Sequence, residues 1–138
     1  MTSKVKYIGE FRSICEHIQS SSIIETDAPT DNHGKGARFS PTDLVSTSLA
    51  SCMLTIMALA GKTHGFSIDG AEATVEKFMG TDPRRIVKIK VNIQFPDFPY
   101  TEKQKQIIRN AAKTCPVSQS LHPDLEQEII FNFDKNKE

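Results

Sequence analysis

The sequence predicts an α+β fold, because its strands gather in groups instead of alternating singly with helices. Residues 39–65 are almost free of charge, which is typical of a helix buried in a core. Residues 85–95 alternate apolar and polar side chains, the pattern of a strand with one buried face. Residues 101–115 carry an apolar stripe at helical spacing. The expected order is two or more strands, a helix, two strands, a helix and a final strand.

The N-terminal part is expected to form a meander of strands. Residues 3–18 and 22–26 are rich in β-branched and aromatic side chains, which favour strands. Residues 27–38 are rich in Gly, Pro, Asn and Asp, and they predict a loop. The long helix would begin directly after this loop.

The long helix carries clear start and stop signals. Ser40 is a good N-cap, Pro41 suits the first helical position, and the Asp43 carboxylate can reach back to the Ser40 N–H. From 44 to 60 the only ionisable side chain is the Cys52 thiol. The candidate stops are Gly61 and Gly65.

A helix of about 20 residues is roughly 30 Å long, so it could also cross a bilayer. Its many hydroxyl side chains and the polar remainder of the chain argue against a membrane span. These hydroxyl residues are Ser46, Thr47, Ser48, Ser51 and Thr55. We expect a core helix buried on most sides, with a second subunit completing its burial.

Composition narrows the class of protein and its compartment. Lys plus Arg and Asp plus Glu both number 17, and this zero net charge favours neither nucleic acid nor a membrane surface as partner. The N-terminal MTSKVKYIGEF lacks the apolar run of a signal peptide. Three cysteines, an odd number, argue against a disulfide scaffold. We expect a single domain over 1–138 in a cytoplasmic protein with reduced thiols.

The second half begins with a predicted hairpin. Residues 67–79 and 85–95 would pair across the turn at 80–83, and Pro96 and Pro99 would end the second strand. Thr101 and Gln104 then form a capping box for the second helix. The apolar stripe of that helix consists of Ile107, Ile108, Ala111 and Ala112.

The chain breaks again at Cys115. Pro116 disfavours a helical conformation at Cys115, so this residue can cap a short new helix at 116–121. Residues 126–133 close the chain as a strand. Strand clusters separated by helices complete the α+β pattern.

Position alone leaves the roles of the cysteines open. Cys52 on an apolar helix reads as a small buried hydrophobe. Cys115 at a helix N-terminus lies where unpaired N–H donors and the helix dipole favour thiolate. Cys15, next to Glu16 in a strand, reads as structural.

No metal or cofactor is expected. The chain lacks C-x-x-C, H-x-x-x-H and H-E-x-x-H spacings and every phosphate-binding glycine motif. The four histidines show no ligand spacing; they are His17, His33, His64 and His122.

Two motifs together resemble the OsmC/Ohr family of organic hydroperoxide reductases. SPTDLVSTSLASCMLTI is similar to the central-helix motif of that family, and AAKTCPVSQSL to its second cysteine motif. The sequence around Cys52, together with ETDAP nearer the N-terminus, is most similar to the OsmC-like branch of the family. The resemblance covers nearly the whole chain.

The resemblance implies antiparallel sheets around a long central helix in an intertwined homodimer. It also implies that Cys52 is the peroxidatic cysteine and Cys115 the resolving one, in a cycle that an external dithiol completes. An apolar pocket lined by Leu49, Met53 and Ile56 would favour alkyl or lipid hydroperoxides.

Two positions depart from the family pattern. The best-known members carry a glutamate immediately after the motif's proline, where this chain has Thr42, and Asp43 is expected to be occupied as a cap. Arg38 is the nearest candidate for the family's substrate-binding arginine, and Arg12 is another. A non-catalytic protein that binds a hydrophobic ligand or senses redox state, and a purely structural domain, therefore stay open beside the peroxidase.

Overall fold

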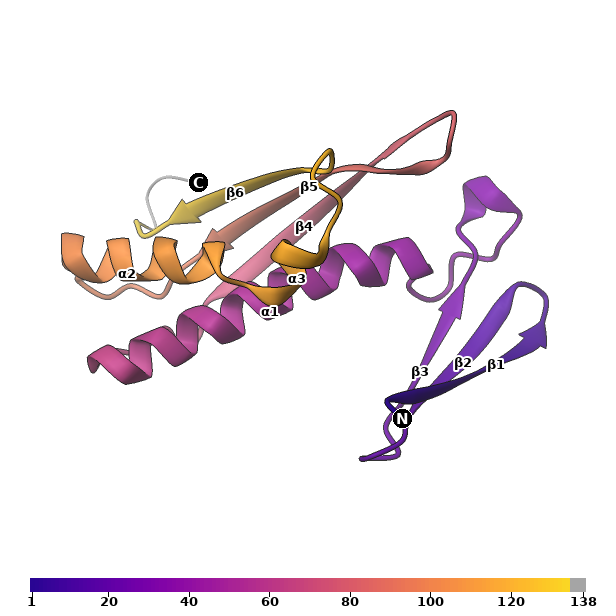
Figure 1. The fold of residues 1–138 in the computed structure, drawn as a ribbon, viewed down its shortest axis with the longest axis horizontal. Coiled ribbons are helices and arrows are strands. Elements are labelled where there is room, and N and C mark those ends of the chain that lie inside the picture. The colour runs from indigo at the N-terminus through magenta and orange to yellow at the C-terminus, as the bar shows by residue number, and fades with distance from the viewer. Residues whose placement is uncertain (135–138) are drawn as a thin grey trace. The chain divides into compact units, whose positions relative to one another are not determined.

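The computed structural model describes residues 1–134. They fall into two compact units, one of residues Met1–Val45 and one that begins at Ser46. The first unit contains three strands and a short 3-10 helix, and the second contains three further strands and most of the helical residues (Figure 1). Strands and helices are clustered as the α+β prediction requires, and that prediction is confirmed.

The first unit is the predicted antiparallel meander. Strands β1 (Ser3–Gly9), β2 (Arg12–His17) and β3 (Ile23–Asp27) pair in that order. The predicted loop follows and contains the 3-10 turn η1 (Thr30–Asn32). The loop is tied back to the sheet because the Asp27 carboxylate accepts the Ala37 N–H at 3.1 Å.

Helix α1 (Pro41–His64) begins and ends where the sequence indicates. The Asp43 N–H donates to Ser40 Oγ at 3.0 Å, and the Ser40 N–H donates to the Asp43 carboxylate at 3.0 Å. These reciprocal bonds satisfy two of the free N–H groups of the first turn. Gly65 follows the helix with φ +80°, a conformation that glycine adopts without strain.

Gly61 does not end α1, since the helix continues past it to His64. Its missing side chain permits a close approach: a Cβ at Gly61 would lie 2.7 Å from the Phe66 carbonyl oxygen. The Phe66 N–H donates to the Gly61 carbonyl at 2.8 Å and folds the chain back onto the helix. Gly61 is therefore a packing position.

The expectation that α1 is buried on most sides is wrong for the single chain. One face is buried in the core, and residues of the other face, such as Ser51, Thr55 and Leu59, are exposed. In the described part of the chain α1 alone is long and apolar enough to span a membrane, and 33 % of its most apolar window is buried. Its apolar composition fits the core face that it supplies to the second unit.

The second sheet has the order β4–β5–β6. Strands β4 (Glu72–Gly80) and β5 (Arg85–Gln94) form the predicted hairpin, although β4 begins five residues later than 67, the expected start. Strand β6 (Glu126–Asn132) pairs with β5 in parallel, which corrects the expectation of purely antiparallel sheets. The parallel pairing arises because the chain between β5 and β6 crosses over through two helices.

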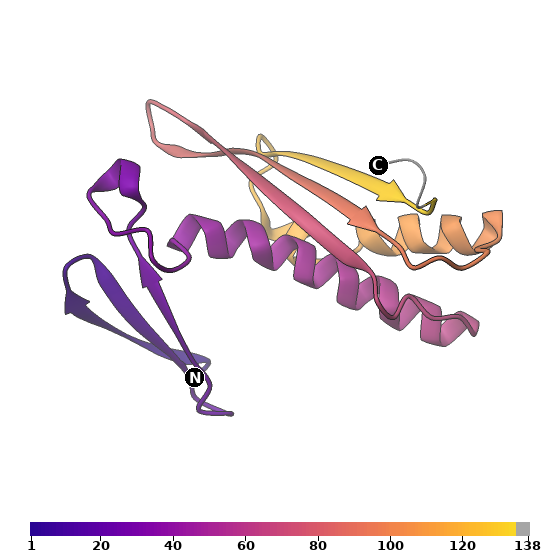
Figure 2. The ribbon, with the colours of Figure 1, turned by 180° about the vertical axis from the view of Figure 1, so that it is seen from behind.

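Those helices are α2 (Glu102–Lys113) and α3 (Pro116–Ser120). The predicted capping box at Thr101 and Gln104 is present in full. Figure 2 shows α1 and α2 on the same side of the sheet. Their buried residues and those of β5 form one core. Its fully enclosed members include Leu49, Met57, Ile89, Val91, Ile93 and Ile108.

Candidate active site

The two predicted redox cysteines are brought together within the second unit. Cys52 lies partly buried on α1 beside the buried Met53. Cys115 is fully buried and is the N-cap of α3, as the sequence indicates, with Pro116 at the first helical position. A hydrogen bond joins the Cys115 thiol to Cys52. Both are free thiols, separated in the chain by a strand hairpin and a helix and adjacent in the fold.

Cys115 is held in its protonated form. Burial raises the pKa of the Cys115 thiol above its ordinary value of 9.0, and the hydrogen bond to Cys52 raises that pKa further. The Ser118 N–H donates to Cys115 Sγ at 3.5 Å and acts in the opposite direction. Burial outweighs the helix N-terminus, so the expectation that this position favours thiolate is corrected.

Ser118 was not predicted to belong to the site. Beyond its N–H bond to Cys115, its hydroxyl donates to Gln127 Oε1 at 2.6 Å, and the Gln127 amide returns a bond to the Ser118 carbonyl at 3.2 Å. These bonds fix α3, and with it Cys115, against β6. The only hint of this in the sequence was the position of Ser118, three residues after the Cys115 N-cap of a short helix.

The candidate arginines both lie in the first unit and both have acidic partners. Arg38 Nε donates to Glu25 at 3.0 Å, and the ion pair is partly exposed. Arg12 makes a two-pronged pair with Asp27, whose side chain is 1 % exposed, at 2.7 and 2.9 Å. This pairing holds the pKa of Asp27 below its usual value.

The position of the family glutamate is also in the first unit. Thr42 stands there, with its Oγ1 3.2 Å from Ser40 Oγ. Asp43 is engaged by the N-cap, as expected. Asp43, the acid that directly follows Thr42, is therefore already engaged in capping α1.

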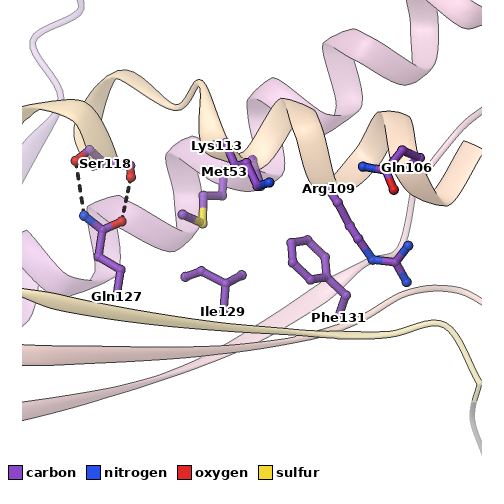
Figure 3. Close-up of a pocket in the computed structure, with 9 residues that line it drawn as sticks. Met53, Gln106, Arg109, Lys113, Ser118, Gln127, Ile129 and Phe131 are labelled. Atoms are coloured by element: carbon purple, nitrogen blue, oxygen red, sulfur yellow. Dashed lines mark hydrogen bonds between the residues drawn. The ribbon is translucent and has the colours of Figure 1, made fainter.

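A cavity of about 570 Å³ lies between α2, α3 and β6 (Figure 3). Ser118, whose N–H donates to Cys115, is one of its lining residues. Met53 contributes to it as expected. The other two predicted pocket residues do not: Leu49 is fully buried, and Ile56 lines a separate depression between α1 and α2. The cavity is lined in part by Ile129 and Phe131 of the last strand.

No group of three or more metal-ligating side chains occurs within residues 1–134. The chemistry available at the cysteine pair is thus that of two thiols in contact, one accessible and one buried. Such a pair suits the formation and reduction of a disulfide.

Comparison with known proteins identifies the family of the chain. The model of the OsmC-like protein family matches residues 33–129. A solved structure from Psychrobacter arcticus 273-4, of a candidate osmotic stress induced and detoxification response protein, is 47 % identical over 96 % of each chain, with a TM-score of 0.91. None of the curated proteins compared with the chain matches it.

More distant structures share the fold. An organic hydroperoxide resistance protein OsmC from Legionella pneumophila is 14 % identical, with 96 % of this chain and 97 % of that chain covered and a TM-score of 0.76. An organic hydroperoxide resistance protein from Elizabethkingia anophelis is 14 % identical, with 97 % of each chain covered and a TM-score of 0.75. With the family model matching most of its length and a relative 47 % identical to it, this chain belongs to the OsmC-like protein family.

Proposed function

We propose that the protein reduces organic hydroperoxides with Cys52 and Cys115 as its redox pair. The observation that carries this proposal is the contact between an accessible thiol on α1 and a buried thiol at the start of α3. The names of the Legionella and Elizabethkingia proteins, which share the fold, refer to resistance to organic hydroperoxides and support the same substrate class.

The difference in burial between the two thiols supports the role proposed for each. Cys52 is the proposed peroxidatic residue because it is only partly buried, whereas Cys115 is fully buried. Cys115 is the resolving residue because it is enclosed and its raised pKa keeps it a neutral thiol until an oxidised partner forms beside it.

The reaction proceeds in three balanced steps. The Cys52 thiolate attacks the distal oxygen of ROOH, the O–O bond breaks, and the products are Cys52–SOH and RO⁻, which takes a proton to become ROH. The Cys115 thiol then attacks the sulfenic sulfur, and water leaves as the disulfide forms. An external dithiol reduces the disulfide by thiol exchange and is itself oxidised.

Arg38 is proposed to hold the hydroperoxide. The support is its charge and its position just before the α1 cap, together with an ion pair to Glu25 that is partly exposed and so can be exchanged. Arg38→Gln should raise KM for hydroperoxide more than it lowers kcat. Lys35→Gln removes a nearby charge, paired with Glu10, and should leave both constants unchanged.

A homodimer in the cytoplasm is part of this proposal. Exposed apolar side chains on the meander, which are unusual for a monomer's surface, support a second copy as partner. Val5 and Ile24 are examples, and both stand in register with Cys15, on one face of the first sheet. Sedimentation of the purified protein should give twice the mass of the 15.4 kDa chain.

Steady-state turnover tests the activity. The protein is incubated with cumene hydroperoxide and dihydrolipoamide, and peroxide loss is compared with that of Cys52→Ser and of the matched control Cys15→Ser. We expect turnover in the wild type and Cys15→Ser and none above background in Cys52→Ser. Equal turnover in wild type and Cys52→Ser, or no peroxide consumption, contradicts the proposal.

A second candidate is a redox sensor or hydrophobic-ligand protein without turnover. Thr42 in the place of the family glutamate favours it, because the first turn of the helix that carries Cys52 then lacks that acid. For a sensor, one equivalent of hydroperoxide would oxidise the cysteine pair but dihydrolipoamide would not sustain repeated cycles. The same assay separates the two candidates.

A further inference from the structure

We propose that the cavity between α2, α3 and β6 is a second binding site, for a single-chain carboxylate amphiphile. Its volume of about 570 Å³ is in the range of small-molecule sites, roughly 300 to 1,000 Å³. All of its lining residues belong to the second unit. Neither Cys52 nor Cys115 lines it, so the site is separate from the redox pair.

The floor of the cavity is apolar. Figure 3 shows Ile129 and Phe131 pointing from β6 toward α2, with Met53 reaching the same space from α1. The amide of Gln127 and the hydroxyl of Ser118 close one end by bonding to each other, which satisfies these polar groups. The interior thus provides apolar surface on which an alkyl chain can pack, and it leaves no polar group there that an alkyl chain would have to hydrogen-bond.

The other side of the cavity is cationic. Arg109 and Lys113 line it from α2, and their spacing of four residues places them on one face of that helix. Within residues 1–134 neither side chain has a carboxylate partner. The charged neighbours on the elements around them pair elsewhere: Lys105 with Glu102, and Lys88 with Glu126 and Glu128.

Arg109 is held in place without being neutralised. Its guanidinium carbon lies 5.4 Å from the centre of the Phe133 ring, a cation–π contact that orients the group and keeps its charge. Two like charges at this spacing repel each other, and an anion between them would remove that repulsion. A carboxylate fits because a guanidinium can bind both of its oxygens.

These two halves specify the ligand class: a carboxylate head at Arg109 and Lys113 and an alkyl chain along Met53, Ile129 and Phe131. A neutral alcohol of the same length would lack the ionic contact, and acetate would lack the apolar one. The site takes no part in the thiol cycle, because neither cysteine lines it.

The test is titration calorimetry with decanoate, below its micelle concentration, on the full-length protein. We expect saturable binding with one site per chain, at least ten-fold tighter than for decanol or acetate. The variant Arg109→Gln/Lys113→Gln should weaken decanoate binding at least ten-fold. The control Lys4→Gln/Lys103→Gln, which removes the same charge at exposed positions outside the cavity, should bind as the wild type does.

Methyl NMR on the wild type gives a second, independent readout. Decanoate should shift the methyl signals of Met53 and Ile129, and Cys52→Ser should bind decanoate unchanged. Decanol binding as tightly as decanoate, full affinity in Arg109→Gln/Lys113→Gln, or no shift at Met53 and Ile129 would each overturn the site. A failed peroxidase assay would leave these results untouched, so the two proposals fail separately.

Discussion

The buried thiol of Cys115 hydrogen-bonds to Cys52, and this contact gives the two cysteines unequal properties. Cys52 is partly buried, whereas burial and the shared hydrogen bond raise the pKa of the fully buried Cys115. In the proposed cycle a peroxide would react at Cys52, and the Cys115 thiol beside it would attack the oxidised product.

The raised pKa of Cys115 predicts a loss of stability in alkali. The folded protein retains the Cys115 proton at pH values where the unfolded chain has lost it. The stabilisation from the buried neutral thiol is thus complete below about pH 9 and is lost as the pH rises through the folded-state pKa. The difference in unfolding free energy between wild type and Cys115→Ala, measured in urea, should shrink from pH 8 to pH 10.

Tyr100, whose pKa is also raised by burial, contributes equally to both proteins in this comparison and cancels. If the difference in unfolding free energy between wild type and Cys115→Ala stays constant or grows with pH, the assigned burial of the neutral thiol is contradicted.

Gly61→Ala should destabilise the protein, although the same change stabilises most helix interiors by about 0.5–1 kcal/mol. The new Cβ would lie 2.7 Å from the Phe66 carbonyl oxygen and 3.3 Å from the Phe66 ring. Backbone must shift to relieve this clash, so we expect a loss of about 1–3 kcal/mol in urea unfolding. Ser51→Ala, at an exposed position of the same helix, is the control and should change stability by less than about 0.5 kcal/mol.

The Arg12–Asp27 pair should stabilise the N-terminal meander in a pH-dependent way. Because Arg12 lowers the pKa of Asp27, the contribution is present above the usual Asp value of 3.8 and is lost as the pH falls through the lower folded-state pKa. Arg12→Ala leaves a buried carboxylate without its partner. Its melting temperature should fall below that of wild type at pH 7, and the gap should narrow at pH 3.

Lys35→Ala, which breaks the exposed pair with Glu10, serves as the control and should melt as the wild type does. If Arg12→Ala melts at the same temperature as the wild type at pH 7, or if the difference in melting temperature is larger at pH 3, the ion pair does not stabilise the meander.

Local signals in the sequence predicted most of the elements. The Ser40 and Thr101 caps, the alternation at 85–95 and the break at Cys115 each depend on neighbouring residues, and each is confirmed. The parallel pairing of β6 was missed because alternation within a strand carries no information about its direction. The spacing of cysteines in the chain likewise says nothing of their contact; the family resemblance supplied it.

The cavity could not be placed from the sequence. Leu49, Met53 and Ile56 follow one another along α1, but the turn of the helix and the packing of β6 leave only Met53 facing it. Nothing in the sequence singles out Arg109 and Lys113 on α2; they line the cavity because β6 lies beside that helix. Side chains from four elements, α1, α2, α3 and β6, line the site, and only the tertiary structure brings them together.

The disulfide that forms in a single turnover tests the central claim most directly. The reduced protein is treated with one equivalent of cumene hydroperoxide, blocked with an alkylating agent, and mapped by peptide mass spectrometry without reductant. We predict a Cys52–Cys115 disulfide with Cys15 alkylated, and in Cys115→Ser a sulfenic acid at Cys52 that dimedone traps. A wild-type protein in which Cys52 and Cys115 remain unlinked after the peroxide is consumed, or in which Cys15 forms the disulfide, would contradict the account.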